Sequence, residues 1–391
     1  MKRFTHHAFH AIQALAGLVL LSGLLYLACN KDDSTTIVNS GLIVEDFDPD
    51  MLNAFPIMGY MRTGSPLYPT IDGGGREVVW TLTEPFEVQT TSPNGGFAPV
   101  VTMKALYDNY YLYILASWQD TSKSADKDVW FYGSPNSGDT TYYEVDTYSW
   151  VKITEPYTGQ LATFSRIKVD STVAPPDTQY VYNYKDLKFS GGEDGLAFMW
   201  NINATNFLNL ADTWPGEDIA LDAGERADIW HWGATRTNPK KHVDDRYVTE
   251  DGLGYDTGIG VFRINEDDGA PAFSEKSDPG ANVLVLVDSV ATPFYAVIPW
   301  PGGSRIAGYV MREPDRSRAD IYAVGVFDDG TWTLEIKRAL ETLDDEGHDI
   351  RFNPDSDAIL EFYIAVYDNG HGLDNASSSD LLLLRFLQFN E

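Results

Sequence analysis

Short runs in which apolar and polar residues alternate are the feature of this sequence that most constrains its fold. A period of two places alternate side chains on one face of a strand, and clusters of Gly, Asp, Asn and Pro bound these runs. No long stretch keeps a helical period. The pattern predicts an all-β protein, an antiparallel β-sandwich with long loop insertions. The predicted strands lie in Val100–Trp118, Tyr142–Ile153, Ala197–Ile202, Val283–Val287, Ile321–Val326, Trp332–Ile336, Leu360–Tyr367 and Leu381–Phe389.

Two polar stretches interrupt this pattern. Asp120–Thr141 predicts a long insertion, and Asn206–Tyr255 predicts an irregular segment. Loops on a rigid sheet commonly carry binding groups, so we expect functional residues there. Residues 67–391 would fit one elaborated sandwich or two; we favour one, because sandwiches of about 200–250 residues are common and insertions supply the remainder.

The N-terminus has the layout of a cleavable export signal. Lys2 and Arg3 precede the apolar stretch Ala14–Leu27, which ends just before Cys29 and is shorter than the ~20 residues of a membrane-spanning helix. Leu24–Cys29 resembles a lipobox, and Asn30–Asp33 resembles the acidic surface-export signal of Bacteroidetes-type lipoproteins. We therefore expect a signal peptide at 1–28, a lipidated Cys29, a flexible tether at 29–66 and a cell-surface position on the outer membrane. A plain secretion signal with an incidental cysteine is the alternative.

Charge and cysteine content limit the possible partners and cofactors. Without residues 1–28 the chain keeps 26 basic and 58 acidic residues, a net charge of −32, which would repel nucleic acid. Cys29 is the only cysteine. If it carries lipid, neither a disulfide nor a Cys-x-x-Cys-His haem attachment is possible, and stability must come from a packed core.

Four separated stretches, in order along the chain, carry a family resemblance. They are Pro69–Gly73 with Trp80; Val101–Asp120, ending in Trp118-Gln119-Asp120; Gly195–Ile202 with Ala227–Trp232 and Arg236–Pro239; and Trp332–Leu340 with Phe362–His371. Together they resemble the haem-binding domain of ethylbenzene dehydrogenase gamma subunits and of related DMSO-reductase-type proteins. The resemblance covers most of the chain from Pro69 to Phe389.

The resemblance implies a sandwich, related to carbohydrate-binding and DOMON-like modules, that holds one b-type haem non-covalently and transfers electrons to or from a partner protein. The family's methionine and lysine ligands to iron do not carry over, because no methionine lies between Phe207 and Asp228 and no lysine follows Asn369. Histidine and methionine are the remaining donors. We expect His371 on one side of the iron and Met199 or His231 on the other. The further expected haem contacts are Trp230, Trp232 and Arg236.

Each candidate ligand also has a structural interpretation. His231 between two tryptophans fits an aromatic corner, Met199 fits a strand core, and His371 fits a solvated turn. Acidic groups offer possible calcium ligands, but they lack EF-hand spacing and favour turns on a solvated surface. These groups are Asp244-Asp245, Asp267-Asp268, Asp328-Asp329 and Asp344–Glu346.

Catalysis by this chain alone is not indicated. The sequence has no Gly-x-Ser-x-Gly, no His-Glu-x-x-His and no phosphate loop. Ten tryptophans and 22 tyrosines support an alternative function, a haem-free sandwich that binds carbohydrate or another extracellular ligand, because aromatic faces stack on sugar rings. The same rings also line haem pockets, so composition leaves both functions open.

Overall fold

The computed structural model describes residues 38–39, 42–44, 47–57, 69–92, 95–133, 149–212, 214, 219–275, 283–295, 300, 302–370 and 376–390. The expected signal peptide, Cys29 and His371 lie outside these residues. The chain divides into two units. The smaller comprises Met1–Phe47 and Phe389–Glu391, and its described part is a sheet of β1 (Val38–Asn39), β2 (Leu42–Val44) and β26 (Phe389–Asn390). Within the described ranges, no helix is long and apolar enough to cross a membrane.

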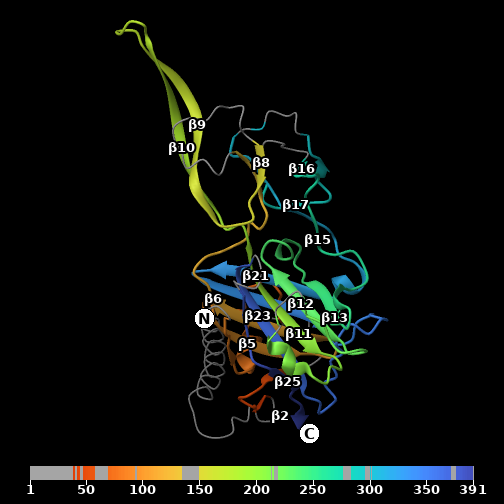
Figure 1. Cartoon of the computed structure of the whole chain (residues 1–391). Helices are drawn as coiled ribbons and strands as arrows, with labels where there is room; N and C mark the ends of the chain where they lie inside the picture. Colours follow the sequence, from red (N-terminus) through yellow and green to blue (C-terminus); the bar gives the residue numbers. More distant parts are fainter. Residues whose placement is uncertain are drawn as a thin grey trace, which may run out of the picture. The chain divides into compact units, whose positions relative to one another are not determined.

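The larger unit, Asp48–Gln388, is built on one 13-stranded sheet (Figure 1). Neighbouring strands are antiparallel except for the parallel pairs that β3 makes with β25 and with β5. Along its main path the order is β14 (Gly252–Tyr255), β13 (Asp244–Thr249), β12 (Ala227–Gly233), β11 (Glu193–Asn201), β23 (Leu360–Gly370), β25 (Leu382–Phe386), β3 (Leu52–Pro56), β5 (Val100–Tyr107), β6 (Tyr111–Gln119), β22 (Thr331–Ala339) and β21 (Ile321–Asp328). In addition, β24 (Ala376–Ser378) pairs with β23, and β4 (Phe86–Gln89) pairs with β5.

The two halves of this sheet face each other. The indole of Trp232 on β12 lies 6.2 Å from that of Trp118 on β6 and 5.2 Å from that of Trp332 on β22, measured between ring centroids. These strands are far apart in the sheet order, so the sheet must fold over on itself into two layers. The expected all-β sandwich is therefore confirmed.

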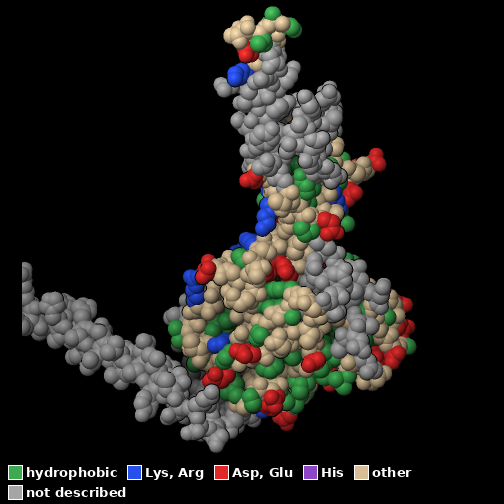
Figure 2. All heavy atoms as spheres, turned by 60° about the vertical axis from the view of Figure 1, so that its left-hand side comes forward, with side chains coloured by type: hydrophobic (Ala, Val, Ile, Leu, Met, Phe, Trp, Pro, Cys, Tyr) green, Lys and Arg blue, Asp and Glu red, His purple; other side chains and the backbone are tan. Residues whose placement is uncertain are grey.

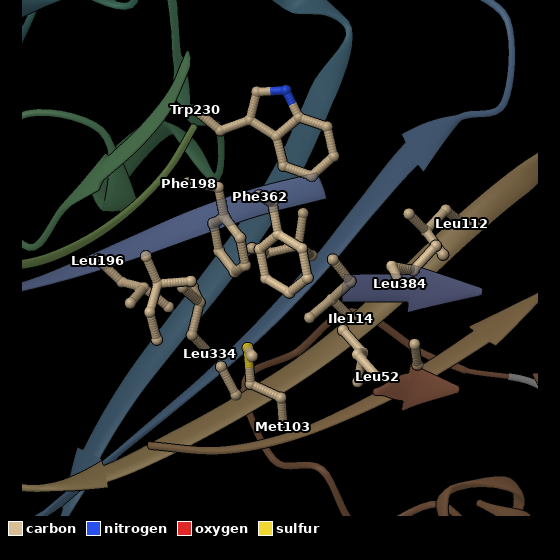
Figure 3. Close-up of a cluster of buried hydrophobic side chains, with 14 of the residues drawn as sticks. Leu52, Met103, Leu112, Ile114, Leu196, Phe198, Trp230, Leu334, Phe362 and Leu384 are labelled. Carbon is tan, nitrogen blue, oxygen red and sulfur yellow. The ribbon is translucent and has the colours of Figure 1, made fainter. Parts of the chain in front are cut away.

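The main core lies between the two layers (Figure 3). On β11, Leu196, Phe198 and Trp200 point inward, where they meet side chains such as Met103 on β5 and Leu334 on β22. Burying an apolar side chain of this size stabilises the fold by about 1.5–3 kcal/mol. The alternation seen in the sequence is the pattern that directs these residues inward.

The outer face of β11 is buried as well. Ala197 and Met199 point outward and join a second cluster with Ile229 of β12, Tyr363 of β23 and Phe207 of the 3-10 helix η3 (Phe207–Asp212). A strand covered on both faces reads as a continuous apolar run, which explains the sequence Gly195–Trp200. This covered outer face is the surface on which His231 also lies.

Smaller sheets complete the larger unit. They are β7 (Trp130–Gly133) with β8 (Ser149–Lys152) and β19 (Arg305–Ile306); β15 (Phe262–Ile264) with β20 (Tyr309–Met311) and β17 (Leu286–Val287); β16 (Phe273–Glu275) with β18 (Ala291–Pro293); and the ribbon of β9 (Tyr157–Asp170) and β10 (Asp177–Phe189). Three further 3-10 helices, η1 (Val78–Leu82), η4 (Asn238–Lys240) and η5 (Arg316–Ala319), connect strands.

Three details differ from the sequence expectations. The expected tether at 29–66 includes β3, whose residues Leu52–Pro56 are all buried between β25 and β5. The expected irregular segment Asn206–Tyr255 contains β12, β13 and β14, because its alternating residues pair with β11 despite their many acids. The ribbon of β9 and β10 has no counterpart among the expected strands.

Candidate functional site

Alternation along β12 separates the residues of the Trp-His-Trp sequence. Trp230 and Trp232 point into the main core, where both are buried, whereas His231 points to the outer face. Neighbouring residues of a strand face opposite sides of the sheet, so the two tryptophans cannot flank the imidazole. The expected contact residues Trp230 and Trp232 are thus placed on the side away from His231.

His231 is half-buried on the outer face and is held by an aromatic stack. Its ring lies 5.1 Å from that of Tyr367 on β23, with an interplanar angle of 24°. Gly195 of β11 lies between the two: a β-carbon there would stand 3.5 Å from the Tyr367 ring and 2.8 Å from the carbonyl oxygen of Trp232. The glycine is therefore required by the close approach of the Trp232 carbonyl oxygen, whereas the two rings would tolerate a β-carbon.

The electrostatic surroundings keep His231 neutral. Burial holds the pKa of its imidazole well below the ordinary value, and the positive charges of Arg236, Arg246 and Lys127 lower it further. Among the described contacts of this side chain there is no hydrogen bond. A neutral imidazole with a free nitrogen lone pair is the form that binds a metal ion or haem iron.

The cations around His231 are anchored. Arg236 pairs with Glu193 at the start of β11, and its guanidinium lies 5.3 Å from the ring centroid of Phe262. Lys127 Nζ donates a hydrogen bond of 2.6 Å to the carbonyl oxygen of Gly370. This places fixed positive charge beside the outer face, where an anionic group would be favoured.

Met199 lies on the same face as His231, one strand away. Its partner across β11 and β12 is Ile229, whereas that of His231 is Ala197. Met199 is fully buried in the second apolar cluster with Phe207 and Tyr363. Of the three expected ligands, Met199 and His231 lie on one face of the sheet, but Met199 is covered by the cluster and only His231 is partly exposed; His371 follows Gly370 outside the described residues.

This surface fits a haem in its donor chemistry. It offers a neutral imidazole beside an apolar cluster that contains the buried Met199 thioether, and the nearby guanidinium and ammonium groups suit the negative charge of haem propionates. Arg236 is the one expected contact residue whose charge acts on His231.

A second polar site lies inside the sandwich and was missed by sequence reasoning. Asp228 of β12 and Asp245 of β13 are fully buried, and Asp349 is 5% exposed. One carboxylate oxygen from each lies within 4.8 Å of the others. The interpretation of Asp244-Asp245 as part of a solvated surface was wrong, because both residues are buried in β13. The pairs Asp267-Asp268 and Asp328-Asp329 are exposed, as expected.

Burial dominates the electrostatics of this interior site. It raises the pKa of Asp228 to about 7, although Arg338 opposes the shift, and it raises the pKa of Asp245 well above its usual value. The sequence Asp228-x-Trp230-x-Trp232 could have indicated this site. With a period of two, Asp228 points to the same side of β12 as the two core tryptophans.

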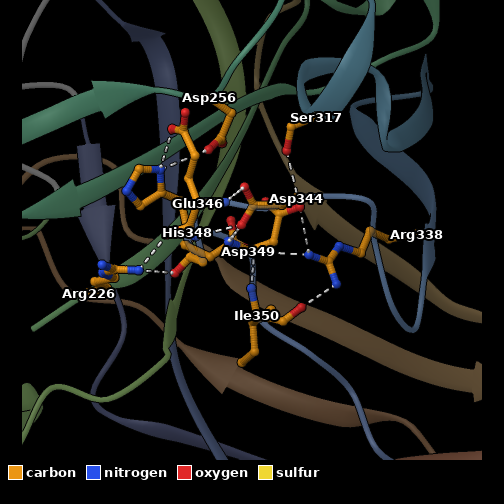
Figure 4. A network of polar contacts seen from close by, with 11 residues as sticks. Arg226, Asp256, Ser317, Arg338, Asp344, Glu346, His348, Asp349 and Ile350 are labelled. Carbon is orange, nitrogen blue, oxygen red and sulfur yellow. Dashed lines mark hydrogen bonds and ion pairs between the residues drawn. The ribbon is translucent and has the colours of Figure 1, made fainter.

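The loop that carries Asp349 is shaped by another acid (Figure 4). Asp344 accepts hydrogen bonds from the backbone N–H groups of Glu346, His348 and Asp349 at 3.0, 2.7 and 3.2 Å. These bonds close a turn and leave Asp349 facing Arg338 and Ser317. Other acidic side chains lie scattered over the visible surface of the described residues and do not gather in one patch (Figure 2).

A third group of acids lies at the other end of β11. Asp194 accepts hydrogen bonds from the Ser124 and Asn369 backbone N–H groups and from Trp332 Nε1. Burial raises its pKa to about 7 and that of Asp120 to about 6. These acids explain the Trp-x-Asp sequence at Trp118–Asp120 as part of a buried polar corner.

A match to a family model agrees with the sequence resemblance. Residues 77–376 match the family model described as ethylbenzene dehydrogenase. None of the curated proteins matches the chain. Two solved structures with some similarity are of a carbohydrate binding module family 9 from Caldicellulosiruptor kristjanssonii, in complex with glucose and with cellotriose. Both are 9% identical to this chain. The alignment with the glucose complex covers 85% of this chain and 95% of the module, with a TM-score of 0.30. The alignment with the cellotriose complex covers 86% of this chain and 93% of the module, with a TM-score of 0.32. Since the family match spans most of the sequence, the chain belongs to the ethylbenzene dehydrogenase family.

Proposed function

We propose that this protein binds one b-type haem non-covalently at the outer face of β11, β12 and β23 and passes electrons to or from a partner protein. Membership of a family whose gamma subunits hold haem supports the cofactor. The observation that carries the assignment to this face is His231, a half-buried imidazole that burial and nearby cations keep neutral.

Each residue of the surface has a defined part in this proposal. His231 would supply one axial nitrogen, with its ring plane held by Tyr367. Arg236, Arg246 and Lys127 would favour the propionates, and the cluster around Met199 would exclude water. When bound, the haem supplies one-electron chemistry at its iron. We propose His371 as the second ligand, and Met199 as the alternative to His231.

The place of action is proposed from the sequence. The chain would be exported, lipidated at Cys29 and exposed on the outer membrane, where a redox partner in the envelope would meet it. Membrane fractionation of cells that produce the full chain tests this proposal. We expect the wild-type protein in the membrane fraction and Cys29→Ser in the soluble fraction; a wild-type protein that stays soluble would exclude the anchor.

Absorption spectroscopy tests the cofactor. The chain without residues 1–28, with Cys29 replaced by serine, should take up added haem and show a Soret band and reducible low-spin bands. His231→Ala should weaken uptake and shift this spectrum. His242→Ala is the matched control, because His242 lies away from the proposed surface: it pairs with Tyr322 of β21, and the two rings are 5.8 Å apart between centroids.

Three outcomes decide between the possibilities. A protein that takes up no haem contradicts the proposal, and specific glycan binding by that colourless protein would favour the carbohydrate-binding alternative. A spectrum unchanged in His231→Ala would remove this residue as a ligand. The spectra of His371→Ala and Met199→Leu then assign the second donor.

A further inference from the structure

The interior site formed by Asp228, Asp245 and Asp349 has too few partners for its charges. Arg338, which is fully buried, lies 3.4 Å from Asp228 Oδ2 and 3.7 Å from Asp349 Oδ2 through Nη2. The backbone N–H of Ile350 also donates to Asp228 Oδ2, at 3.1 Å. These contacts use one oxygen of Asp228 and one of Asp349. None of the described ion pairs reaches Asp245.

The remaining carboxylate oxygens are buried without a hydrogen-bond partner. They are both oxygens of Asp245, Oδ1 of Asp228 and Oδ1 of Asp349. A buried polar atom without a partner is costly, and a buried unpaired charge is more costly still. Asp245 is the clearest case, because its side chain is fully buried and neither of its oxygens is satisfied.

Two acids from the other groups in the described part of the chain, Asp194 and Glu335, show how a buried carboxylate can be satisfied. Asp194 accepts three N–H groups, from Ser124, Asn369 and Trp332, at 2.7–3.0 Å. Glu335 likewise accepts the backbone N–H groups of Asp72 and Gly73 and the indole N–H of Trp80. No such set of donors surrounds Asp245, so its surplus negative charge calls for a cation.

We propose that Asp228, Asp245 and Asp349 bind one calcium ion inside the sandwich, at a site separate from the proposed haem surface. The ligand set consists only of carboxylate oxygens, which favours a hard cation over zinc or copper. Calcium accepts irregular sets of carboxylate and carbonyl oxygens, whereas magnesium usually keeps several waters and is rarely held by a cage of protein ligands alone, which a fully buried site would require. The three oxygens lie within 4.8 Å of one another, close enough to share one ion.

The location indicates what the ion does. Asp228 and Asp245 lie on adjacent strands of one layer, and Asp349 lies on the loop after β22 of the other layer. An ion shared by all three ties the two layers together and offsets the charge that Arg338 leaves uncompensated. Calcium therefore stabilises the folded sandwich and takes no part in electron transfer.

Thermal unfolding of the full chain, without added haem, tests the site. After dialysis against EDTA, addition of calcium chloride to 1 mM should raise Tm by roughly 4 °C. Asp245→Asn should lose this response, and in EDTA its Tm should equal or exceed that of the wild type, because an unpartnered buried carboxylate has been removed. Asp72→Asn is the matched control, since Asp72 belongs to another carboxylate group and its side chain is exposed. It should respond as the wild type does.

Several results would overturn the proposal. One is a wild-type Tm that is the same in EDTA and in calcium, with no calcium retained after gel filtration. Another is an increase in Tm with calcium that persists in Asp245→Asn. An equal rise with magnesium chloride would exclude the assignment to calcium. If Asp245→Asn does not fold, Asp349→Asn serves as the second variant with the same expected loss. Because no haem is present, these outcomes are independent of the electron-transfer proposal.

Discussion

Replacing Gly325 by alanine tests how closely the two layers of the sandwich approach at Trp232. A β-carbon at Gly325 on β21 would overlap Cζ2 of the Trp232 indole and lie 2.7 Å from its Cη2. The indole cannot move aside easily, because Trp118 and Trp332 pack against it. The glycine is thus required by packing and not by a left-handed backbone.

The magnitude follows from the structure. Overpacking a well-filled core by one methyl group costs about 1–3 kcal/mol. The larger unit spans 341 residues from Asp48 to Gln388. At about 2.1 cal/mol/K per residue its unfolding entropy is about 0.7 kcal/mol/K, so a loss of about 2 kcal/mol lowers Tm by about 3 °C.

A double-mutant cycle isolates the contact. In a Trp232→Phe background, which removes the overlapping atoms, Gly325→Ala should be neutral or stabilise by about 0.5 kcal/mol, because alanine restricts the unfolded chain. Gly96→Ala is the control, since a β-carbon there meets only Ser92 Oγ, at 3.7 Å. Thermal and urea unfolding measure all variants. Equal destabilisation by Gly325→Ala in both backgrounds would refute the close approach.

Three further predictions concern the polar and outer sites. Because the pKa of His231 is lowered in the folded protein, the free energy of unfolding is unaffected by the protonation of this residue above pH 6.5 and decreases as the pH falls below that value. In urea unfolding, His231→Gln should therefore lose less stability than the wild type between pH 7.5 and pH 5. Arg338→Met should cost about 3 kcal/mol or more in EDTA at pH 8 and less at pH 5, where Asp228 and Asp245, whose pKa values are raised by burial, can bind protons; a loss independent of pH would contradict this. Tyr363→Phe removes hydroxyl hydrogen bonds to the carbonyl oxygens of Phe207 and Leu208 and should cost about 1 kcal/mol by the same assay, with no change in m-value.

The strand pattern was readable because it depends on local chemistry. Alternation along Val101–Tyr107 and Leu196–Trp200 directs side chains to two faces, and a face of large apolar residues must be buried. The short strand Leu52–Pro56 escaped notice, because five residues beside prolines carry little pattern and its place in the sheet depends on partners far along the chain.

The ligand candidates show the limit of such reasoning. Sequence proximity grouped Trp230, His231 and Trp232, but a period of two sends the histidine to the opposite face from the tryptophans. Its actual neighbours, Tyr367 and Gly195, come from two other strands. Only the pairing of three different strands brings His231, Tyr367 and Gly195 together.

The buried acids show the same division. The sequence by itself determined an all-β chain, its family and its large excess of acidic residues. It could not determine which acids are solvated, because a turn acid and a core acid are chemically identical. The tertiary structure decided this by pairing β12 with β13 and placing the loop of Asp349 against Arg338, which removes three carboxylates from water. Burial depends on contacts between distant parts of the chain, and these form only when the whole sandwich closes.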